Sequence, residues 1–413
     1  MSSRAAFRHR DFRIFQGARF LMTIAIQMQS VAVGWQVYAT THRAMDLGYV
    51  GLAEFVPTFL LALVAGAAAD RYDRRKIIIL TTLGVGACSL ALLSLARMHA
   101  GVGGIYAVLV AFGVARAFTG PASQALLPSL VPKEDFANAV TWMSSLFQVA
   151  TILGPALGGV LYGAGGASAV YAATAVTSVV VAVLVAQVRP SGEPIEERGA
   201  SWGTFLAGIR YVRQHRVLLG CISLDLFAVL FGGATALLPI FASDVLFVGP
   251  WGLGLLRSAP AAGAAVMGTV IAHRPLKRHA GLTMLGCVAL FGVATVVFGL
   301  SKSFALSLAA LVVTGAADMV SVVIRQTLVQ LRTPHAMRGR VSAVNMMFIV
   351  TSNELGEFES GVTAAWFGAV PAVVVGGLGS LLVVLLWTVG FRELRDVDRL
   401  EDEGPPSGSL AVH

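Results

Sequence analysis

Long apolar stretches alternate with short polar segments along the whole chain. The hydrocarbon core of a bilayer is about 30 Å thick, so one helical crossing needs roughly 20 apolar residues. Stretches of this length predict membrane-spanning helices that start near residues 13, 47, 76, 103, 136, 167, 217, 251, 281, 304, 337 and 370. The pattern predicts an all-α membrane protein with twelve transmembrane helices.

The composition also indicates a membrane protein. Hydrophobic residues make up 56% of the 413 residues and charged residues only 13%, whereas soluble domains carry about 25% charged residues. The first apolar stretch, at residues 12–39, is too long for the core of a signal peptide, so we expect it to be retained as a span.

The positions of the 30 Lys and Arg residues predict the orientation in the membrane. Most of them lie in alternate loops and in the tails, while the opposite loops hold only Arg43, Arg97 and Lys302. Loops rich in Lys and Arg stay in the cytoplasm. Both termini are therefore predicted to be cytoplasmic, and the net charge of +8 reflects topology rather than a nucleic-acid partner.

The two halves of the chain resemble each other at an offset of about 202 residues. The matched pairs include Gly66 with Gly268, Gln124 with Gln326, Pro132 with Pro334, and Gly154 with Gly356. Such a repeat predicts two pseudo-symmetric six-helix bundles with a binding site between them. The predicted parts are an N-terminal bundle (1–188), a cytoplasmic linker (189–216), a C-terminal bundle (217–392) and a disordered cytoplasmic tail (393–413).

Within the linker, the segment "GTFLAGIRYVRQHR" has the spacing of an amphipathic helix. Its apolar residues Phe205, Leu206, Ile209 and Val212 repeat at helical intervals. Its arginines, Arg210, Arg213 and Arg216, are available to anionic headgroups. We expect a short interfacial helix, with a plain solvated linker as the alternative.

A glycine and charge pattern follows the second span, in "GAAADRYDRRKI". This loop resembles the signature loop of the major facilitator superfamily, Gly-x-x-x-Asp-Arg-x-Gly-Arg-Arg, with Asp73 where Gly is usual. Gly66 would permit close helix approach, and Asp70 could accept hydrogen bonds from a helix N-terminus or pair with Arg. The resemblance implies that the neighbour is span 11, and the gate residues would be Gly66, Asp70, Arg71, Arg74, Arg75, Arg338 and Arg340. A turn that only fixes topology is the alternative.

The fifth span ends in "LGPALGGVLYG", which is similar to the Gly-Pro-x-x-Gly-Gly pattern of antiporters in the same superfamily. Small residues let helices pack closely, and Pro lets a helix bend. The helix-packing residues would be Gly154, Pro155, Gly158 and Gly159. The resemblance favours export over import.

Nearly the whole chain, from about residue 5 to 395, is similar to the branch of this superfamily that includes the bacterial enterobactin exporters. The phrases that carry this resemblance are "GWQVYATT", "RGRVSAVN" and "SNELGEFESG". It implies an exporter of the bacterial inner membrane that moves a small amphipathic molecule, such as a siderophore or a drug. We also expect a monomer that uses a proton gradient and no cofactor.

Three carboxylates interrupt the apolar eleventh span, at Glu354, Glu357 and Glu359. Carboxylates crowded in a low dielectric resist simultaneous ionisation, so we expect one of them to exchange a proton near neutral pH. Glu354 and Glu357 share a helix face and are the first choices for proton coupling. The alternatives for coupling are Glu54, Asp225 and Asp318, and a purely structural hydrogen-bonded cluster also stays open.

Polar residues inside the spans should face the interior, because a charge in lipid costs several kcal/mol. The predicted substrate cavity comprises Arg19, Gln27, Arg116, Gln124, Asp225, Asp318, Arg325, Gln326 and Asn345. The repeat offset relates Arg116 to Asp318 and Glu54 to Arg257. Such opposite charges could attract each other across one cavity, or each charge could pair locally within its own half.

Other classes of function fit the sequence less well. The chain has no Gly-rich phosphate cradle of Walker type, no Ser elbow, no HExxH and no His pair with metal spacing, so an enzyme is not expected. The internal repeat favours a single-chain carrier over an oligomeric channel. A lipid or lysolipid carrier of the same fold remains the alternative, ahead of a non-transporting sensor.

Overall fold

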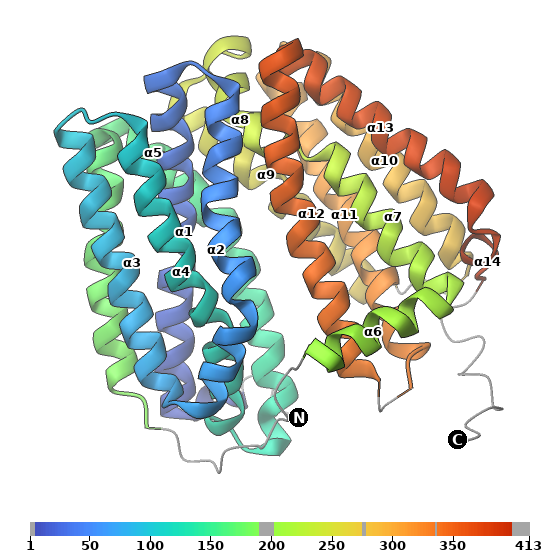
Figure 1. The fold of residues 1–413 in the computed structure, drawn as a ribbon, viewed down its shortest axis with the longest axis horizontal. Coiled ribbons are helices and arrows are strands. Elements are labelled where there is room, and N and C mark those ends of the chain that lie inside the picture. Colours follow the sequence, from blue (N-terminus) through green and yellow to red (C-terminus); the bar gives the residue numbers. More distant parts are fainter. Residues whose placement is uncertain (1–4, 190–201, 275–277, 335–336, 399–413) are drawn as a thin grey trace. The chain divides into compact units, whose positions relative to one another are not determined.

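The computed structural model describes residues 5–189, 202–274, 278–334 and 337–398, without the side chains of 63 and 202–205. Helices joined by short loops account for these residues, and no strand occurs among them (Figure 1). The chain is all-α, as the apolar pattern predicted. Most of the predicted tail lies outside the described residues.

The long helices are α1 (Arg10–Thr41), α2 (Ala44–Arg71), α3 (Arg74–Arg97), α4 (Val102–Leu126), α5 (Phe136–Ala186), α7 (Arg216–Gly232), α9 (Gly249–His273), α10 (Ala280–Leu300), α11 (Phe304–Leu331), α12 (Arg338–Phe367) and α13 (Ala369–Gly390). The short elements are η1 (Ala6–Arg8), η2 (Leu127–Ser129), η3 (Lys133–Asp135), α6 (Trp202–Gln214), η4 (Ala234–Leu237), α8 (Leu238–Ile240), η5 (Phe241–Val245) and α14 (Arg392–Arg395).

The helices form two compact units. Unit 1 comprises Met1–Ala200 and Leu238–Ser258, and unit 2 comprises Ser201–Leu237 and Ala259–His413. Residues 238–258 lie within the predicted C-terminal bundle, yet they pack with the helices of unit 1. Unit 1 is therefore built from two separate parts of the chain, and the second part comes from the C-terminal half.

In unit 1, α1 packs along α5, α2 packs along α4, and α3 packs against both α4 and α5. The helix α5 is not continuous, because Gly166 has a φ of 66° and a ψ of −169°. A straight helix of its 51 residues would be about 77 Å long, more than twice the thickness of a bilayer core. The break lets the chain turn back at the point where the sixth apolar stretch was predicted to begin.

In unit 2, α10 packs against α11 and α13, and α7 packs against α12 and α13 (Figure 1). A single apolar core joins these helices, with Leu224, Met284, Ile324 and Val344 among its buried members. The helix α6 crosses the ends of α12 and α7 and adds Val212 to the same core. The predicted amphipathic helix is therefore present and packed on unit 2.

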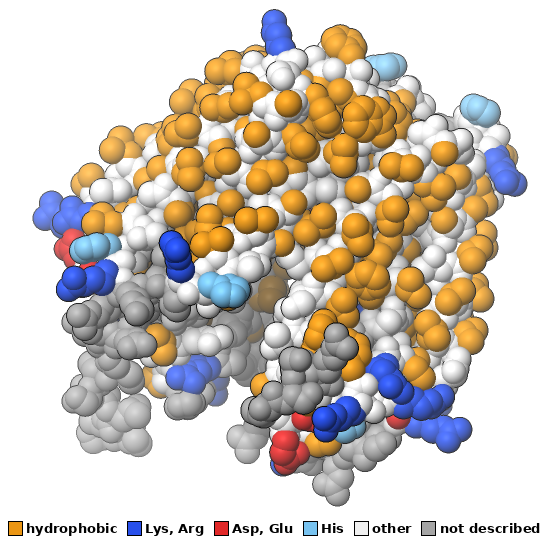
Figure 2. Space-filling model, turned by 180° about the vertical axis from the view of Figure 1, so that it is seen from behind, with side chains coloured by type: hydrophobic (Ala, Val, Ile, Leu, Met, Phe, Trp, Pro, Cys, Tyr) orange, Lys and Arg blue, Asp and Glu red, His pale blue; other side chains and the backbone are white. Residues whose placement is uncertain are grey.

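The surface has the chemistry of a membrane protein. Ten helical stretches of the described residues are long and apolar enough to cross a bilayer. Many large apolar side chains on them are exposed, including Leu60, Leu80, Val176, Leu385 and Val389. Figure 2 shows the result: apolar side chains cover the middle of the visible face, and most Lys and Arg side chains lie at its margins. Lipid is the solvent that such a surface requires.

The chain beyond α13 covers the start of α10. The backbone N–H groups of Ala280 and Gly281 donate to the carbonyls of Asp398 and Val397, at 3.1 and 3.0 Å. These bonds satisfy donors that a helix N-terminus otherwise leaves without a partner. A Cβ on Gly281 would lie 1.9 Å from the Leu394 carbonyl oxygen, so this contact requires glycine.

An ion pair joins the segment after α13 to α7: the Arg216 guanidinium lies 3.0 Å from the Glu393 carboxylate. Hydrogen bonding from its own backbone, followed by that from Arg216, lowers the pKa of Glu393. A carboxylate with a lowered pKa stays ionised at neutral pH and loses the ion pair only as the pH falls through that pKa.

We expect Gly281→Ala to lower the free energy of unfolding by about 1–3 kcal/mol, because the added methyl group forces the segment 394–398 away from α10. Thermal unfolding of the purified protein in detergent would measure the change. Gly286→Ala on the same helix is the control, since a Cβ there would meet no described atom within 4 Å. Equal unfolding temperatures for the two variants would contradict the packing described here.

Candidate functional site

A buried ion pair lies at the centre of unit 2. The Arg325 guanidinium on α11 pairs with the Asp225 carboxylate on α7, and the side chains are only 2% and 7% exposed. Both residues were predicted as cavity residues, and the structure brings them together within one unit. Burying either charge alone would cost several kcal/mol, so each residue requires the other.

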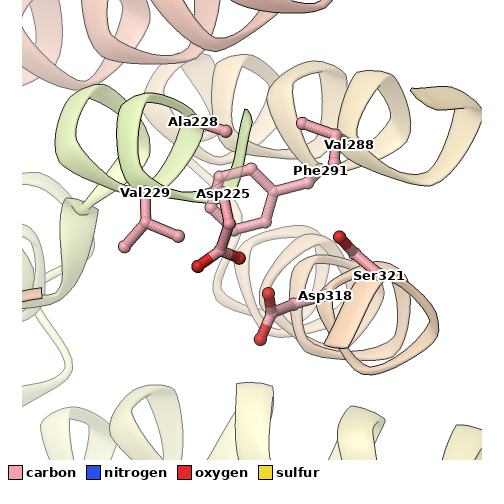
Figure 3. Close-up of a pocket in the computed structure, with 7 residues that line it drawn as sticks. All are labelled: Asp225, Ala228, Val229, Val288, Phe291, Asp318 and Ser321. Atoms are coloured by element: carbon pink, nitrogen blue, oxygen red, sulfur yellow. The ribbon is translucent and has the colours of Figure 1, made fainter. Parts of the chain in front are cut away.

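A small cavity borders this ion pair. Its lining comes from α7, α10 and α11: Asp225, Ala228, Val229, Val288, Phe291, Asp318 and Ser321. Figure 3 shows the carboxylates of Asp225 and Asp318 extending from α7 and α11 into the same space. The cavity has about 10 Å³ of room for the centre of a water molecule, which is enough for one.

The polar groups at this cavity differ in their partners. Asp225 is paired with Arg325, whereas Asp318 makes no ion pair within the described part of the chain. The buried hydroxyl of Ser321 has no hydrogen-bond partner among the described residues. Two carboxylates and one hydroxyl around a space of this size form a site that can take up, hold and release a proton.

Unit 1 contains a more exposed ion pair. The Arg116 guanidinium on α4 lies 2.9 Å from the Glu54 carboxylate on α2, and the two side chains are 43% and 17% exposed. The helices approach closely beside this pair, because a Cβ on Gly113 would lie 2.5 Å from the Glu54 carbonyl oxygen. Arg116 and Glu54 therefore pair locally within their own unit, the second of the two arrangements considered from the sequence.

The three glutamates predicted from the eleventh span lie on α12. Glu354, Glu357 and Glu359 are all half-buried. The Thr363 hydroxyl donates to the Glu359 carboxylate at 2.7 Å, so Glu359 takes part in a local hydrogen bond on the same helix. The coupling role of Glu354 and Glu357 stays a prediction.

The remaining predicted cavity residues have different surroundings. Arg19 on α1 is half-buried, donates to the Met143 sulfur and lies 5.9 Å from the centre of the Phe15 ring. Gln27 is half-buried, Gln124 and Gln326 are exposed, and Asn345 is buried. The Asn345 Oδ1 atom has no hydrogen-bond partner within the described ranges. Their roles in binding stay predictions.

The signature loop is held within unit 1 by its basic residues. Arg74 donates to the Ala125 carbonyl at 2.9 Å, and Arg75 donates to the Val188 carbonyl at 2.8 Å. Asp73, which departs from the superfamily pattern, caps α3 by accepting from the backbone N–H groups of Arg75 and Lys76. This capping role was not predicted from the sequence, although Asp before a helical stretch is a recognisable N-cap signal.

Other residues of the signature loop make few contacts within their unit. A Cβ on Gly66 would meet no described atom within 4 Å, so the close approach predicted there is not one within unit 1. Asp70 is exposed, and Arg71 lies 5.9 Å from the centre of the Tyr72 ring. Arg338 and Arg340 belong to unit 2, where Arg338 donates to the Thr333 carbonyl at 3.2 Å. A pairing of Asp70 with either arginine stays a prediction.

The glycine motif of α5 packs against two helices of unit 1. A Cβ on Gly154 would lie 2.5 Å from the Gln27 Cβ, and one on Gly158 would lie 2.7 Å from the Met28 Cα, both on α1. On Gly159, an added Cβ would lie 2.5 Å from the Pro250 carbonyl oxygen and 3.0 Å from the Gly254 Cα. The motif therefore permits backbone contact with α1 and with the first part of α9.

A second contact of the segment 238–258 could not have been read from the sequence. The Tyr38 hydroxyl on α1 donates to the Asp244 carboxylate, which lies in the π-helix η5. Short π-helices occur often at functional positions. More than 200 residues separate the two partners, and no local pattern connects them.

Comparison with known proteins gives the family. A family model described as transmembrane secretion effector matches residues 1–405. The chain belongs to this family of major facilitator transporters. The enterobactin exporter EntS of Citrobacter koseri is 27% identical over 391 residues, which are 94% of this chain and 93% of the relative. EntS of Escherichia coli O6:K15:H31 is 26% identical over 405 residues, 97% and 96% of the two chains.

Solved structures show the fold that this family member shares. A bacterial homologue of the human lysosomal transporter Spinster, in an inward-facing and unoccupied conformation, has a TM-score of 0.72 at 14% identity and covers 93% of this chain and 95% of its own. The nucleoside transporter NupG has a TM-score of 0.70 at 13% identity, with 93% and 99% covered. The family and its relatives are transporters rather than enzymes, and the chain is a multi-pass protein of the inner membrane.

We expect Arg325→Met to lower the free energy of unfolding by about 3–5 kcal/mol, because it leaves the Asp225 carboxylate buried without its partner. The double variant Asp225→Leu/Arg325→Met removes both charges and should recover most of that loss. Arg116→Met is the control, since a partly exposed pair contributes about 1 kcal/mol or less.

Thermal unfolding in detergent distinguishes these cases. A double variant whose loss of stability equals the sum of the two single losses would contradict a mutually dependent pair. A loss for Arg325→Met no larger than that for Arg116→Met would contradict a buried pair.

Proposed function

We propose that this chain is a proton-coupled antiporter that exports a small amphipathic molecule by alternating access. The observation that carries the proposal is the acidic cavity of unit 2, where Asp318 lies beside the Asp225–Arg325 pair. A proton-coupled transporter needs at least one group that changes its protonation between two states of the cycle. Membership of the transmembrane secretion effector family supports the direction of transport.

The proposed topology has twelve spans with both termini in the cytoplasm. Two features support twelve rather than ten. The break at Gly166 divides α5 into two parts, the shorter of which is about 30 Å long. The helix α12 is too polar to be recognised by its composition, yet its 30 residues extend over about 45 Å. The basic loops support the orientation.

For the cargo, we propose a siderophore. The support is similarity over nearly the whole chain to proteins named as enterobactin exporters. The exposed Arg116 and the half-buried Arg19 could bind the oxygen atoms with which a siderophore chelates iron. Drug-like amphipathic compounds would use the same basic and apolar contacts, which would link the protein to multidrug resistance.

For the coupling, we assign the exchanged proton to Asp318 first. Its carboxylate shares a cavity with that of Asp225, and two close carboxylates resist simultaneous ionisation. Since Asp225 is neutralised by Arg325, the charge of Asp318 is the one that a proton would remove. Glu354 and Glu357 on α12 would extend the proton path, and Glu54 would respond through its pair with Arg116.

A lipid or lysolipid carrier is the second candidate. The feature that favours it is an apolar groove of about 510 Å³ on unit 1, between α2 and α4. Its lining is almost entirely apolar: Tyr49, Leu52, Ala53, Val56, Pro57, Leu60, Tyr106 and Val110. An acyl chain would match this lining, whereas a siderophore would not need it.

We expect Asp318→Asn to reduce enterobactin transport driven by a pH gradient at least tenfold in proteoliposomes, because the asparagine cannot exchange a proton. Binding of enterobactin to the same variant, measured by calorimetry, should change less than threefold. Glu354→Gln and Glu357→Gln should each give a smaller loss. Glu393→Gln is the control, because the Glu393 side chain is exposed and lies on α14, outside the spans.

Transport by Asp318→Asn that still follows the pH gradient would contradict its coupling role. Transport of lysophospholipid but not enterobactin by the unmodified protein would instead favour the second candidate.

A further inference from the structure

The short helix α6 has two faces with different partners. Gly208 and Val212 lie close together around the helix and are buried, with Val212 in the core of unit 2. At 100° per residue, Leu206, Arg210 and Arg213 lie on the opposite face. All three are exposed, and Leu206 keeps 56% of its surface accessible.

The exposed face has the chemistry of a membrane surface. An apolar side chain between two guanidinium groups can insert at the headgroup boundary while the arginines bind phosphate. The orientation agrees, because α6 runs across the ends of α7 and α12 rather than parallel to them (Figure 1). Arg210 and Arg213 are both exposed, and they make no ion pair within the described residues.

The buried face connects α6 to the helices that carry the acidic residues. A Cβ on Gly208 would lie 2.7 Å from the Arg340 carbonyl oxygen and 2.9 Å from a Val344 methyl group, both on α12. The Tyr211 hydroxyl donates to the Arg332 carbonyl, just beyond α11, at 3.3 Å. A displacement of α6 would therefore also displace the first turns of α12 and the end of α11.

The joint between α6 and α7 is also well defined. The Tyr211 and His215 rings are stacked at 4.0 Å, and His215 Nδ1 lies 2.8 Å from the Tyr211 carbonyl oxygen. The backbone N–H of Leu219 donates to the His215 carbonyl at 2.9 Å, which continues the chain directly into α7. Helix α6 is thus joined to α7, α11 and α12 through short, specific contacts.

We propose that Arg210 and Arg213 form a binding site for an anionic phospholipid of the surrounding bilayer, and that the bound lipid fixes α12 through Gly208. Leu206 inserts beside the lipid, and the two guanidinium groups bind its phosphate. The first turns of α12 then become more rigid when the lipid is present. The proposal requires only that unit 2 lies in a membrane, and it does not depend on which molecule is transported.

Native mass spectrometry of the full chain in detergent, titrated with phosphatidylglycerol, tests the site. Arg210→Gln/Arg213→Gln should weaken binding of the first phosphatidylglycerol by about tenfold or more. Arg392→Gln/Arg395→Gln is the matched control on α14, with the same loss of charge, and should change it less than twofold. Equal weakening in both double variants, or equal affinity of the unmodified protein for phosphatidylcholine, would overturn the proposal.

Hydrogen exchange in nanodiscs with and without phosphatidylglycerol tests the connection to α12. In the unmodified protein, the lipid should slow exchange of the amides of residues 338–345 at least threefold. Gly208→Ala keeps both arginines but displaces α6 from α12, so it should bind the lipid and lose this slowing. Gly286→Ala should retain it. If the lipid slows exchange in Gly208→Ala as much as in the unmodified protein, α12 is not fixed through Gly208. If Gly208→Ala no longer binds the lipid, Arg210 and Arg213 alone do not form the binding site.

Discussion

The buried ion pair between Arg325 and Asp225 governs how unit 2 can pack. An isolated guanidinium or carboxylate in an apolar interior costs several kcal/mol, so neither α7 nor α11 could bury its charge without the other. Once the charges are joined, apolar side chains close around them, with Leu224 of α7 and Ile324 of α11 in the same core. The position of Asp318 beside Asp225 follows from this arrangement. The charge balance of the cavity therefore depends on one neutralised pair.

The ion pair inside unit 1 is more exposed to solvent than the pair in unit 2. The pair formed by Arg116 and Glu54 is partly exposed, and α2 and α4 are in close backbone contact beside it at Gly113. An exposed pair can exchange its partner for water or for a substrate at little cost, whereas a buried pair cannot. This difference supports the proposal that the cargo contacts Arg116 of unit 1 and that Asp318 of unit 2 exchanges the proton. This division of roles would explain why related helices in a repeated chain carry different charges.

The segment 238–258 belongs by sequence to the second half and by packing to unit 1. Glycine makes this possible, because Gly159 and Gly254 allow α5 and α9 to touch along their backbones. The backbone of the segment is irregular, with a π-helix at Phe241–Val245 and positive φ values at Phe247 and Gly249. Gly233 interrupts the helix before it, and Pro260 lies inside the helix after it. The irregular backbone thus lies where the chain passes between units.

The sequence by itself determined the local features of this protein. The lengths of the apolar stretches predicted the long helices, including a new span that begins next to Gly166 in α5. The spacing of Leu206 and its neighbours predicted the amphipathic helix α6. These features depend on residues close together in the chain. Only the tertiary structure decided that Arg325 pairs with Asp225, that Arg116 pairs with Glu54, and that Tyr38 reaches Asp244. Such pairs form because two helices are neighbours at matching depth and rotation, which helical periodicity does not specify. The partners of Glu354 and Glu357 depend on those same unspecified quantities, and so a sequence pattern could locate the carboxylates but could not assign them a role.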